Sequence, residues 1–303
     1  MTRVLISDHV DIDMLSLGPN FQVDYKPGIS RDDLLRAVGG YEVLVVRSRT
    51  KVDRELLENA PRLKLVARPG TGLDNVDVEY AMSRGIQVVN SPESLVEAVA
   101  EQVTLLMLAL SRRVVGADES TRAGRWEKES FMGVELKGHV LGIVGLGRIG
   151  RRIGEIARTL GMTLLVYDVV TISSEVITSL SCRVVGIDEL FSSSDYVTLH
   201  VPMTEQTRHM VDARRLGTMK KSAFIINTSR GGVIDEPALS QALESGRLAG
   251  AALDVFEKEP PSGKILTAPN VLLTPHISGQ TVEAQASAIT VVGEKIRAFF
   301  PKG

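Results

Sequence analysis

The last quarter of the sequence contains an arginine, a glutamate and a histidine whose side chains suit the oxidation of an alcohol: Arg230, Glu259 and His276. In that chemistry a base takes the hydroxyl proton while a hydride leaves the carbon. A fixed cation holds a substrate carboxylate or polarises the forming carbonyl oxygen. A carboxylate beside the base favours its protonated form. Taken singly, the arginine could cap a strand end, the glutamate could be a solvated loop residue and the histidine a core residue, so the interpretation depends on what accompanies them.

A glycine-rich turn lies upstream of these residues. The apolar run 140–144 leads into the pattern G-x-G-x-x-G, with its glycines at Gly145, Gly147 and Gly150. The first glycine permits a tight turn, the second lets the backbone approach a pyrophosphate, and the third lets the next helix pack on the strand. A helical pattern follows, and its N-terminus would present free N–H groups to the phosphates. The segment predicts a dinucleotide-binding unit, with the pyrophosphate on Gly147, Arg148 and Ile149.

A carboxylate follows the glycine turn at the spacing that a dinucleotide site requires. Asp168 stands eighteen residues beyond Gly150, at the end of the apolar run 164–167. A carboxylate there accepts hydrogen bonds from ribose hydroxyls and repels a 2′-phosphate, and the residues at 169–171 supply no basic group to offset that repulsion. We therefore expect NAD, rather than NADP, as the cofactor.

Polar residues also follow the later apolar runs. Thr228, Arg230, Asp254 and His276 each stand at or just after the end of such a run. Ligands of open α/β sheets bind outside the carboxyl ends of the strands, so we expect these four side chains to face one crevice, Thr228 and Asp254 beside the cofactor. The segment His200, Val201 and Pro202 is expected to shape the cofactor pocket. The remaining histidines, which we expect to be structural or surface residues, are His9, His139 and His209.

The elements that must position these residues alternate along the whole chain. Short β-branched runs, such as 4–7, 43–46, 65–67 and 87–89 early on and six more between 140 and 274, are separated by helical patterns. This alternation predicts parallel sheets built from βαβ units with helices on both faces. Ten strands are many for one open sheet, so we expect two domains. Long helical patterns at 96–113 and 282–300 flank the nucleotide unit, which predicts an α/β fold with two Rossmann-like domains: an NAD-binding domain (96–281) inserted into a split substrate domain (1–95 and 282–303).

Composition excludes several other classes of protein. The 303 residues carry 35 Lys and Arg against 37 Asp and Glu, and a net charge of −2 does not suit a general nucleic-acid binder. The single cysteine, Cys182, cannot form an intrachain disulfide. The longest apolar run, 103–110, is shorter than the roughly 18 residues that cross a bilayer. Because no metal-binding motif is present either, we expect a soluble cytoplasmic protein without a metal site or membrane partner.

The motifs together resemble the D-isomer-specific 2-hydroxyacid dehydrogenases over nearly the whole chain. The resemblance lies in the glycine turn with Asp168 and in the segments 199–204, 226–235, 254–260 and 274–277. It implies that Arg230, Glu259 and His276 are catalytic, that the cofactor domain is inserted, and that the protein is a homodimer. Thr207 and Gly279 are expected as further cofactor contacts.

The first domain is most similar to the family members that oxidise 3-phospho-D-glycerate in serine biosynthesis. Arg47 and Arg68 could bind the phosphate, and Gly70 and Thr71 could offer backbone N–H groups to the substrate carboxylate. We therefore expect oxidation of this substrate to 3-phosphohydroxypyruvate. Only 27 residues follow His276, so we expect the form without a further C-terminal regulatory domain.

Three departures from the family pattern leave the substrate open: Pro69, Leu95 and Gln102. Two alternatives therefore stand beside the main expectation. One is a glyoxylate or hydroxypyruvate reductase, or another D-2-hydroxyacid dehydrogenase. The other is a non-catalytic NAD-sensing co-repressor built on the same scaffold, which the presence of the three catalytic residue types does not exclude.

Overall fold

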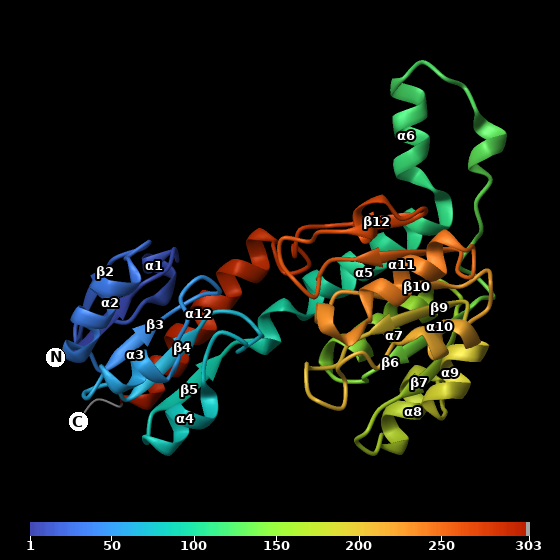
Figure 1. The fold of residues 1–303 in the computed structure, drawn as a ribbon. Coiled ribbons are helices and arrows are strands. Elements are labelled where there is room, and N and C mark those ends of the chain that lie inside the picture. Colours follow the sequence, from blue (N-terminus) through green and yellow to red (C-terminus); the bar gives the residue numbers. More distant parts are fainter. Residues whose placement is uncertain (301–303) are drawn as a thin grey trace. The chain divides into compact units, whose positions relative to one another are not determined.

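The structure, a computed structural model, describes residues 1–300 and divides into two compact units (Figure 1). The first consists of Met1–Val96 and Gly279–Gly303, and the second of Glu97–Ser278. The second junction thus lies at 278/279, where the sequence predicted 281/282. Both sheets are parallel, which confirms the predicted α/β class.

A five-stranded sheet of order β2-β1-β3-β4-β5 forms the first unit. Its strands are β1 (Thr2–Ile6), β2 (Phe21–Tyr25), β3 (Val43–Val45), β4 (Leu65–Arg68) and β5 (Gln87–Asn90). Its helices are α1 (Ile12–Leu15), α2 (Arg31–Ala37), η1 (Val38–Gly40), α3 (Arg54–Glu58), α4 (Val78–Ser83), η2 (Pro92–Leu95) and α12 (Val282–Phe299). All strands run the same way, so their carboxyl ends share one edge.

The two ends of the sequence meet in the core of this unit. One face of the sheet packs on apolar residues of α12, among them Val292 and Ile296, together with Leu15 of α1. The opposite face packs on residues of α2, α3 and α4. A Cβ on Gly293 would overlap the carbonyl oxygen of Leu15, so α12 approaches the end of α1 as closely as a glycine allows. The return of the last helix closes the split unit, as Figure 1 shows in red against blue.

The second unit is a seven-stranded sheet of order β12-β11-β10-β9-β6-β7-β8. Its strands are β6 (Val140–Val144), β7 (Thr163–Tyr167), β8 (Arg183–Val184), β9 (Tyr196–Leu199), β10 (Phe224–Asn227), β11 (Gly250–Leu253) and β12 (Val271–Leu273). Its helices are α5 (Val96–Arg112), α6 (Val114–Arg122), η3 (Lys128–Phe131), α7 (Arg148–Thr159), α8 (Ser174–Leu180), α9 (Ile187–Ser193), α10 (Ala213–Thr218), η4 (Gly231–Val233), α11 (Glu236–Glu244) and η5 (Lys264–Thr267). The strand order reverses between β6 and β9, the switch point at which such sheets bind ligands.

The helical stretch Pro92–Arg112 is long and apolar enough to span a membrane by length and composition, although the longest uninterrupted apolar run is short. Core helices of globular proteins pass the same test. Of its most apolar 18-residue segment, 44% is buried inside the protein. The Ser111 hydroxyl hydrogen-bonds the Tyr196 hydroxyl of β9 at 2.7 Å. These contacts are those of a helix packed on its own sheet.

Candidate active site

The carboxyl edge of the seven-stranded sheet holds a histidine–carboxylate pair. His276 lies just beyond β12, and its Nδ1 is 2.9 Å from Oε2 and 3.1 Å from Oε1 of Glu259. The side chains are 53% and 42% exposed, so both are open to small molecules. Because Glu259 occupies Nδ1, Nε2 is the ring nitrogen left open for exchange of a proton.

Asp254 holds the segment that carries this histidine. Its carboxylate is fully buried at the end of β11 and accepts hydrogen bonds from the Thr274 hydroxyl (2.5 Å), the Ile277 N–H (2.9 Å) and both the N–H (2.8 Å) and hydroxyl of Ser278. His276 has φ of +55°, a conformation that persists only where surrounding contacts impose it. Asp254 therefore positions His276, a task that the sequence did not reveal; its predicted contact with the cofactor stays a prediction.

Arg230 lies on the neighbouring loop, after β10. The loop is tied to the end of its own strand, because Asn227 Nδ2 donates to the Arg230 carbonyl (2.9 Å) while Asn227 Oδ1 accepts from the Ser229 N–H (3.0 Å). The half-buried Arg230 guanidinium donates to the Ser229 carbonyl (2.6 Å). A Cβ on Gly231 would overlap the Phe256 carbonyl group, so the loop of Arg230 packs directly on the loop that leads to Glu259. The structure thus brings the loops of all three predicted catalytic residues together.

The glycine turn has the geometry that its motif predicts. Gly145 has φ of +91°, and a Cβ there would overlap the carbonyl of His200, the residue after β9. A Cβ on Gly150 would overlap the Gly145 carbonyl, which shows how tightly α7 packs on the turn. Gly147 caps α7 and has open space where a side chain would stand. The turn therefore leaves room beside the helix N-terminus, where the half-buried Ile149 and the exposed Arg148 begin α7.

Asp168 is fastened to this turn. Its carboxylate accepts the Leu146 N–H at 2.7 Å and the Val170 N–H at 3.0 Å. The side chain thereby holds the glycine turn against the end of β7, in addition to its predicted contact with a ribose. Val169 and Val170 are 88% and 70% exposed, so no basic side chain stands beside Asp168 in the next two positions.

The other predicted cofactor residues line the same edge. His200 Nε2 is 2.8 Å from the Thr198 hydroxyl, and burial lowers the His200 pKa to about 3, so this ring stays neutral near pH 7 and is no acid or base for catalysis. The Thr207 hydroxyl donates to the Pro202 carbonyl at 2.6 Å and braces the turn that follows Val201. The Thr228 hydroxyl oxygen is buried without a hydrogen-bond partner, the condition of a group that a bound ligand would satisfy. Gly279 is the exception, since it belongs to the first unit.

In the first unit, Arg47 is the cation best prepared for an anion. It follows β3, is half-buried, and donates through Nη2 to Oε1 of Gln285 on α12. This partner is neutral, so it orients the guanidinium without cancelling its charge. Burial lowers the Arg47 pKa because the charged form loses water. A half-desolvated guanidinium gains from binding a phosphate or carboxylate, although the nearby charge of Asp8 already stabilises this one in part.

Buried Asp8, beyond β1, organises the rest of this basic loop. Its carboxylate accepts from the Arg47 N–H (2.6 Å), the Thr50 N–H (3.2 Å) and hydroxyl (2.8 Å), and Nε of Arg49 (2.9 Å). The Arg49 side chain therefore forms an ion pair with Asp8, whereas Asp8 binds Arg47 through the backbone N–H. Asp8 was missed by sequence reasoning, although its place after a strand was a usable signal.

Arg68 and the turn after β4 are joined to the basic loop by Asn75. Its amide nitrogen donates to the carbonyls of Arg47 (2.7 Å) and Thr50 (2.6 Å), and its oxygen accepts from Nε of Arg68 (3.0 Å). The Gly70 N–H donates to the Ser91 hydroxyl at 2.8 Å. That amide is engaged within the protein in this structure, and its role as a donor to the substrate carboxylate stays a prediction.

Three further residues bear on the substrate loop. The Thr71 hydroxyl oxygen is buried without a hydrogen-bond partner, which leaves it available to a ligand. Leu95 packs on Gly279, where a Cβ would stand 3.2 Å from its Cδ1. Pro69 is buried. Two of the three departures from the family pattern, Pro69 and Leu95, thus lie within the packed structure of the first unit, whereas the third, Gln102, lies on α5 of the second unit.

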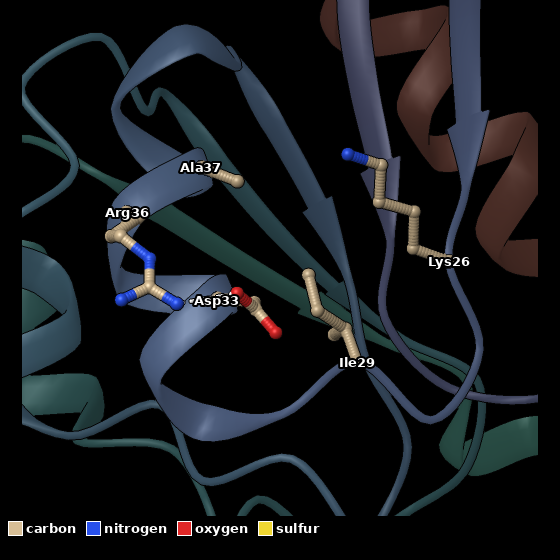
Figure 2. A pocket seen from close by; sticks show the side chains of 5 residues that line it. All are labelled: Lys26, Ile29, Asp33, Arg36 and Ala37. Carbon is tan, nitrogen blue, oxygen red and sulfur yellow. Dashed lines mark hydrogen bonds and ion pairs between the residues drawn. The ribbon is translucent and has the colours of Figure 1, made fainter.

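A separate hollow of about 470 Å³ lies on the first unit (Figure 2). Its lining consists of Lys26, Ile29, Asp33, Arg36 and Ala37. Asp33 already binds Arg36 at 2.6 Å, so the charges satisfy each other at the surface. Within residues 1–300 no cluster of His, Cys, Asp and Glu suits a metal ion.

Comparisons with known proteins agree with this geometry. Residues 104–278 match the family described as D-isomer specific 2-hydroxyacid dehydrogenase, NAD binding domain. The chain is 43% identical to D-3-phosphoglycerate dehydrogenase of Methanocaldococcus jannaschii, with 98% of this chain and 57% of that protein covered. It is 42% identical to hydroxypyruvate reductase of Thermotoga maritima, with 88% of each covered.

Solved structures resemble the whole chain as well. The D-lactate dehydrogenase of Aquifex aeolicus, complexed with NAD and lactic acid, superposes with a TM-score of 0.86 at 29% identity, covering 98% of this chain and 95% of that one. The chain spans a little over half the length of the first curated relatives that it matches.

Proposed function

Because the chain belongs to the D-isomer specific 2-hydroxyacid dehydrogenase family, we propose that it catalyses NAD-dependent oxidation of 3-phospho-D-glycerate to 3-phosphohydroxypyruvate, the first step of L-serine biosynthesis. The observation that carries the proposal is the exposed Glu259–His276 pair packed beside the loop of Arg230, at the carboxyl edge of an NAD-binding sheet. The name shared by several relatives at 42–43% identity supports the substrate.

The residues divide the chemistry among them. Nε2 of His276 takes the proton of the C2 hydroxyl, and Glu259 at Nδ1 stabilises the imidazolium that results. Arg230 holds the substrate carboxylate and polarises the C2 oxygen. NAD, when bound, would supply the acceptor for the hydride that leaves C2. Arg230, Glu259 and His276 thus divide the binding and proton-transfer roles, and His200 with its low pKa remains neutral throughout.

The residues present fit the cofactor. The open space at Gly147 and the N-terminus of α7 suit a pyrophosphate, and the unpartnered hydroxyl of Thr228 suits a polar group of the nucleotide. Asp168, with acidic charge and no basic neighbour in the next two positions, favours NAD over NADP. We propose that Arg148, Ile149, His200, Val201, Pro202, Thr207, Asp254 and Gly279 complete this site.

For the substrate phosphate we propose Arg47, supported by its half-buried guanidinium with a neutral partner. Arg68 and the unpartnered hydroxyl of Thr71 are proposed as further substrate contacts.

A glyoxylate or hydroxypyruvate reductase is the second candidate, favoured by the relative of that name at 42% identity. Steady-state reduction of phosphohydroxypyruvate, hydroxypyruvate and glyoxylate with NADH and with NADPH separates the two. The proposal expects the highest kcat/KM for phosphohydroxypyruvate with NADH. A higher kcat/KM for glyoxylate or hydroxypyruvate would transfer the assignment to the second candidate.

A homodimer in the cytoplasm completes the proposal. In Figure 1, α6 and the segment after it extend away from the second sheet. This arm exposes large apolar side chains, among them Trp126 (83%) and Met132 (81%). A dimer interface over this arm would cover these exposed apolar side chains. Sedimentation equilibrium should give twice the 32.8 kDa chain mass, and a concentration-independent single-chain mass would contradict the dimer.

A further inference from the structure

The loops of Arg230 and Glu259 are joined by more than the close packing of Gly231. Glu236, the first residue of α11, and Glu257, two residues before Glu259, exchange hydrogen bonds. The Glu236 N–H donates to Oε1 of Glu257 at 3.0 Å, and the Glu257 N–H donates to Oε1 of Glu236. Each carboxylate thus binds the other residue's backbone, and this reciprocal arrangement bridges the two loops.

A histidine completes the bridge. His209 Nε2 lies 3.2 Å from Oε1 of Glu257, a contact without the geometry of a hydrogen bond, and the His209 N–H donates to the Gly232 carbonyl at 2.8 Å. His209 has φ of +47°, so its backbone is held in a conformation that an L-residue rarely adopts. The residue therefore contacts both loops, one through its ring and one through its backbone, although its sequence context gave it no role.

The arrangement brings two acidic side chains close together. Burial is the main cause that raises the pKa of Glu236, and the charge of Glu257 adds to it. The N-terminus of the nine-residue α11 offsets part of this cost, because its dipole favours negative charge. Neutral side chains would suffice to close a loop here. Hydrogen bonds to carboxylates are stronger than neutral ones, so these two fix the backbones of both loops at defined points, which a precisely spaced site requires.

We propose that Glu236, Glu257 and His209 form a positioning clasp that sets the spacing between Arg230 and the Glu259–His276 pair. None of the three touches the reacting atoms. The clasp rests on the proposed dehydrogenase function, because spacing matters only if Arg230 and His276 act on one substrate. A displacement of about 1 Å far from the chemistry can lower a rate by about 100-fold, so loosening the clasp should slow the reaction.

The test compares disruptive and conservative variants in the full chain. Glu257→Ala and Glu236→Ala each remove one half of the reciprocal bonds, whereas Glu257→Gln retains the oxygen that accepts the Glu236 N–H. Glu244→Ala is the matched control, because Glu244 ends the same helix and its contact with Lys264 is long (3.9 Å) and exposed. The readouts are kcat and KM for 2-keto acid reduction, NADH affinity by fluorescence, and thermal unfolding by circular dichroism.

The clasp predicts that each disruptive variant lowers kcat about tenfold or more with NADH affinity within twofold of the parent. Glu257→Gln should recover most of kcat, and Glu244→Ala should match the parent. The double variant Glu236→Ala/Glu257→Ala should lose no more than either single variant, because both break one device.

Three results would overturn the clasp while the proposed function stands. The first is parent-like kcat in Glu257→Ala, even with a lower unfolding temperature. The second is loss of NADH affinity in step with activity. The third is multiplicative loss in the double variant. If one of the two alanine variants does not fold, Glu257→Gln is compared with the alanine variant that does. A kcat of Glu257→Gln as low as that of this folded alanine variant counts against the clasp. If the parent chain binds NADH but reduces no 2-keto acid, the proposed function is wrong, and the clasp, which rests on it, is wrong as well.

Discussion

The carboxyl edges of the two sheets hold their charged side chains in opposite ways. At the edge of the seven-stranded sheet, Glu259 and His276 bind each other at the surface, so the pair is exposed and ready to exchange a proton. At the edge of the five-stranded sheet, the Arg47 guanidinium is half-buried and hydrogen-bonded to a neutral amide, while the charge of Asp8 acts on it only from nearby. This difference suits the second unit to proton transfer and the first to anion binding, the two tasks that the proposed function assigns to them.

The largest effect is expected from removing the proposed base at the carboxyl edge of the seven-stranded sheet. His276→Asn should lower kcat by about 100- to 10,000-fold for every 2-keto acid, because general acid–base catalysis is lost. NADH affinity should stay within twofold, since Asn lacks only the titrating ring. Steady-state and fluorescence measurements check both. Unchanged turnover would show that the exposed pair is not the proton-exchanging group.

Changing the first edge should alter discrimination rather than chemistry. Arg47→Ala removes a charge-assisted contact and should lower kcat/KM for phosphohydroxypyruvate about 10- to 100-fold. Hydroxypyruvate, which lacks the phosphate, should lose much less. The ratio of the two kcat/KM values is the measurement.

Arg49→Gln is the control for this ratio. It also removes one positive charge from the loop, but Arg49 is already paired with buried Asp8. The ratio should therefore stay near that of the parent. An equal change in both variants would mean that the net charge of the loop, not the placement of Arg47, selects the substrate.

A smaller effect concerns the neutral histidine of the second edge. Burial holds the His200 pKa near 3, against an ordinary value of 6.5, so the unfolded chain binds a proton between these pH values that the folded chain refuses. The free energy of unfolding is therefore unaffected by this ring above about pH 6.5, where it is neutral in both states. As the pH falls below that value, the free energy of unfolding declines, with a slope approaching about 1.4 kcal/mol per pH unit. Urea unfolding between pH 7 and 4 should show a shallower decline in His200→Gln than in the parent. Parallel declines would show that this ring does not titrate on unfolding.

The fold was predictable where the chain follows simple periodicity. Ten apolar runs correspond to strands, but β2 was missed because Gln22 and Asp24 interrupt it at a sheet edge, and β8 because it has two exposed residues. The extended arm around α6 has a largely exposed helix and gave no apolar periodicity strong enough to place it.

The site was predictable where the chemistry follows strand ends, as for Glu259 and His276. The supporting contacts were not, because they join residues far apart in sequence. Arg47 and Gln285 are separated by 238 positions, and Asp8 and Arg47 by 39. The pairing of Glu236 with Glu257 could not be predicted for the same reason. In the sequence each is a glutamate in a polar segment, and only the fold brings the two loops together.

The most direct test of the central claim is the fate of the hydride. Reduction of 3-phosphohydroxypyruvate with NADH deuterated at C4 of the nicotinamide should yield 3-phosphoglycerate of the D configuration with deuterium at C2, seen by mass spectrometry and chiral analysis. NADH binding without transfer of deuterium to C2, or transfer giving the L isomer, would contradict the account.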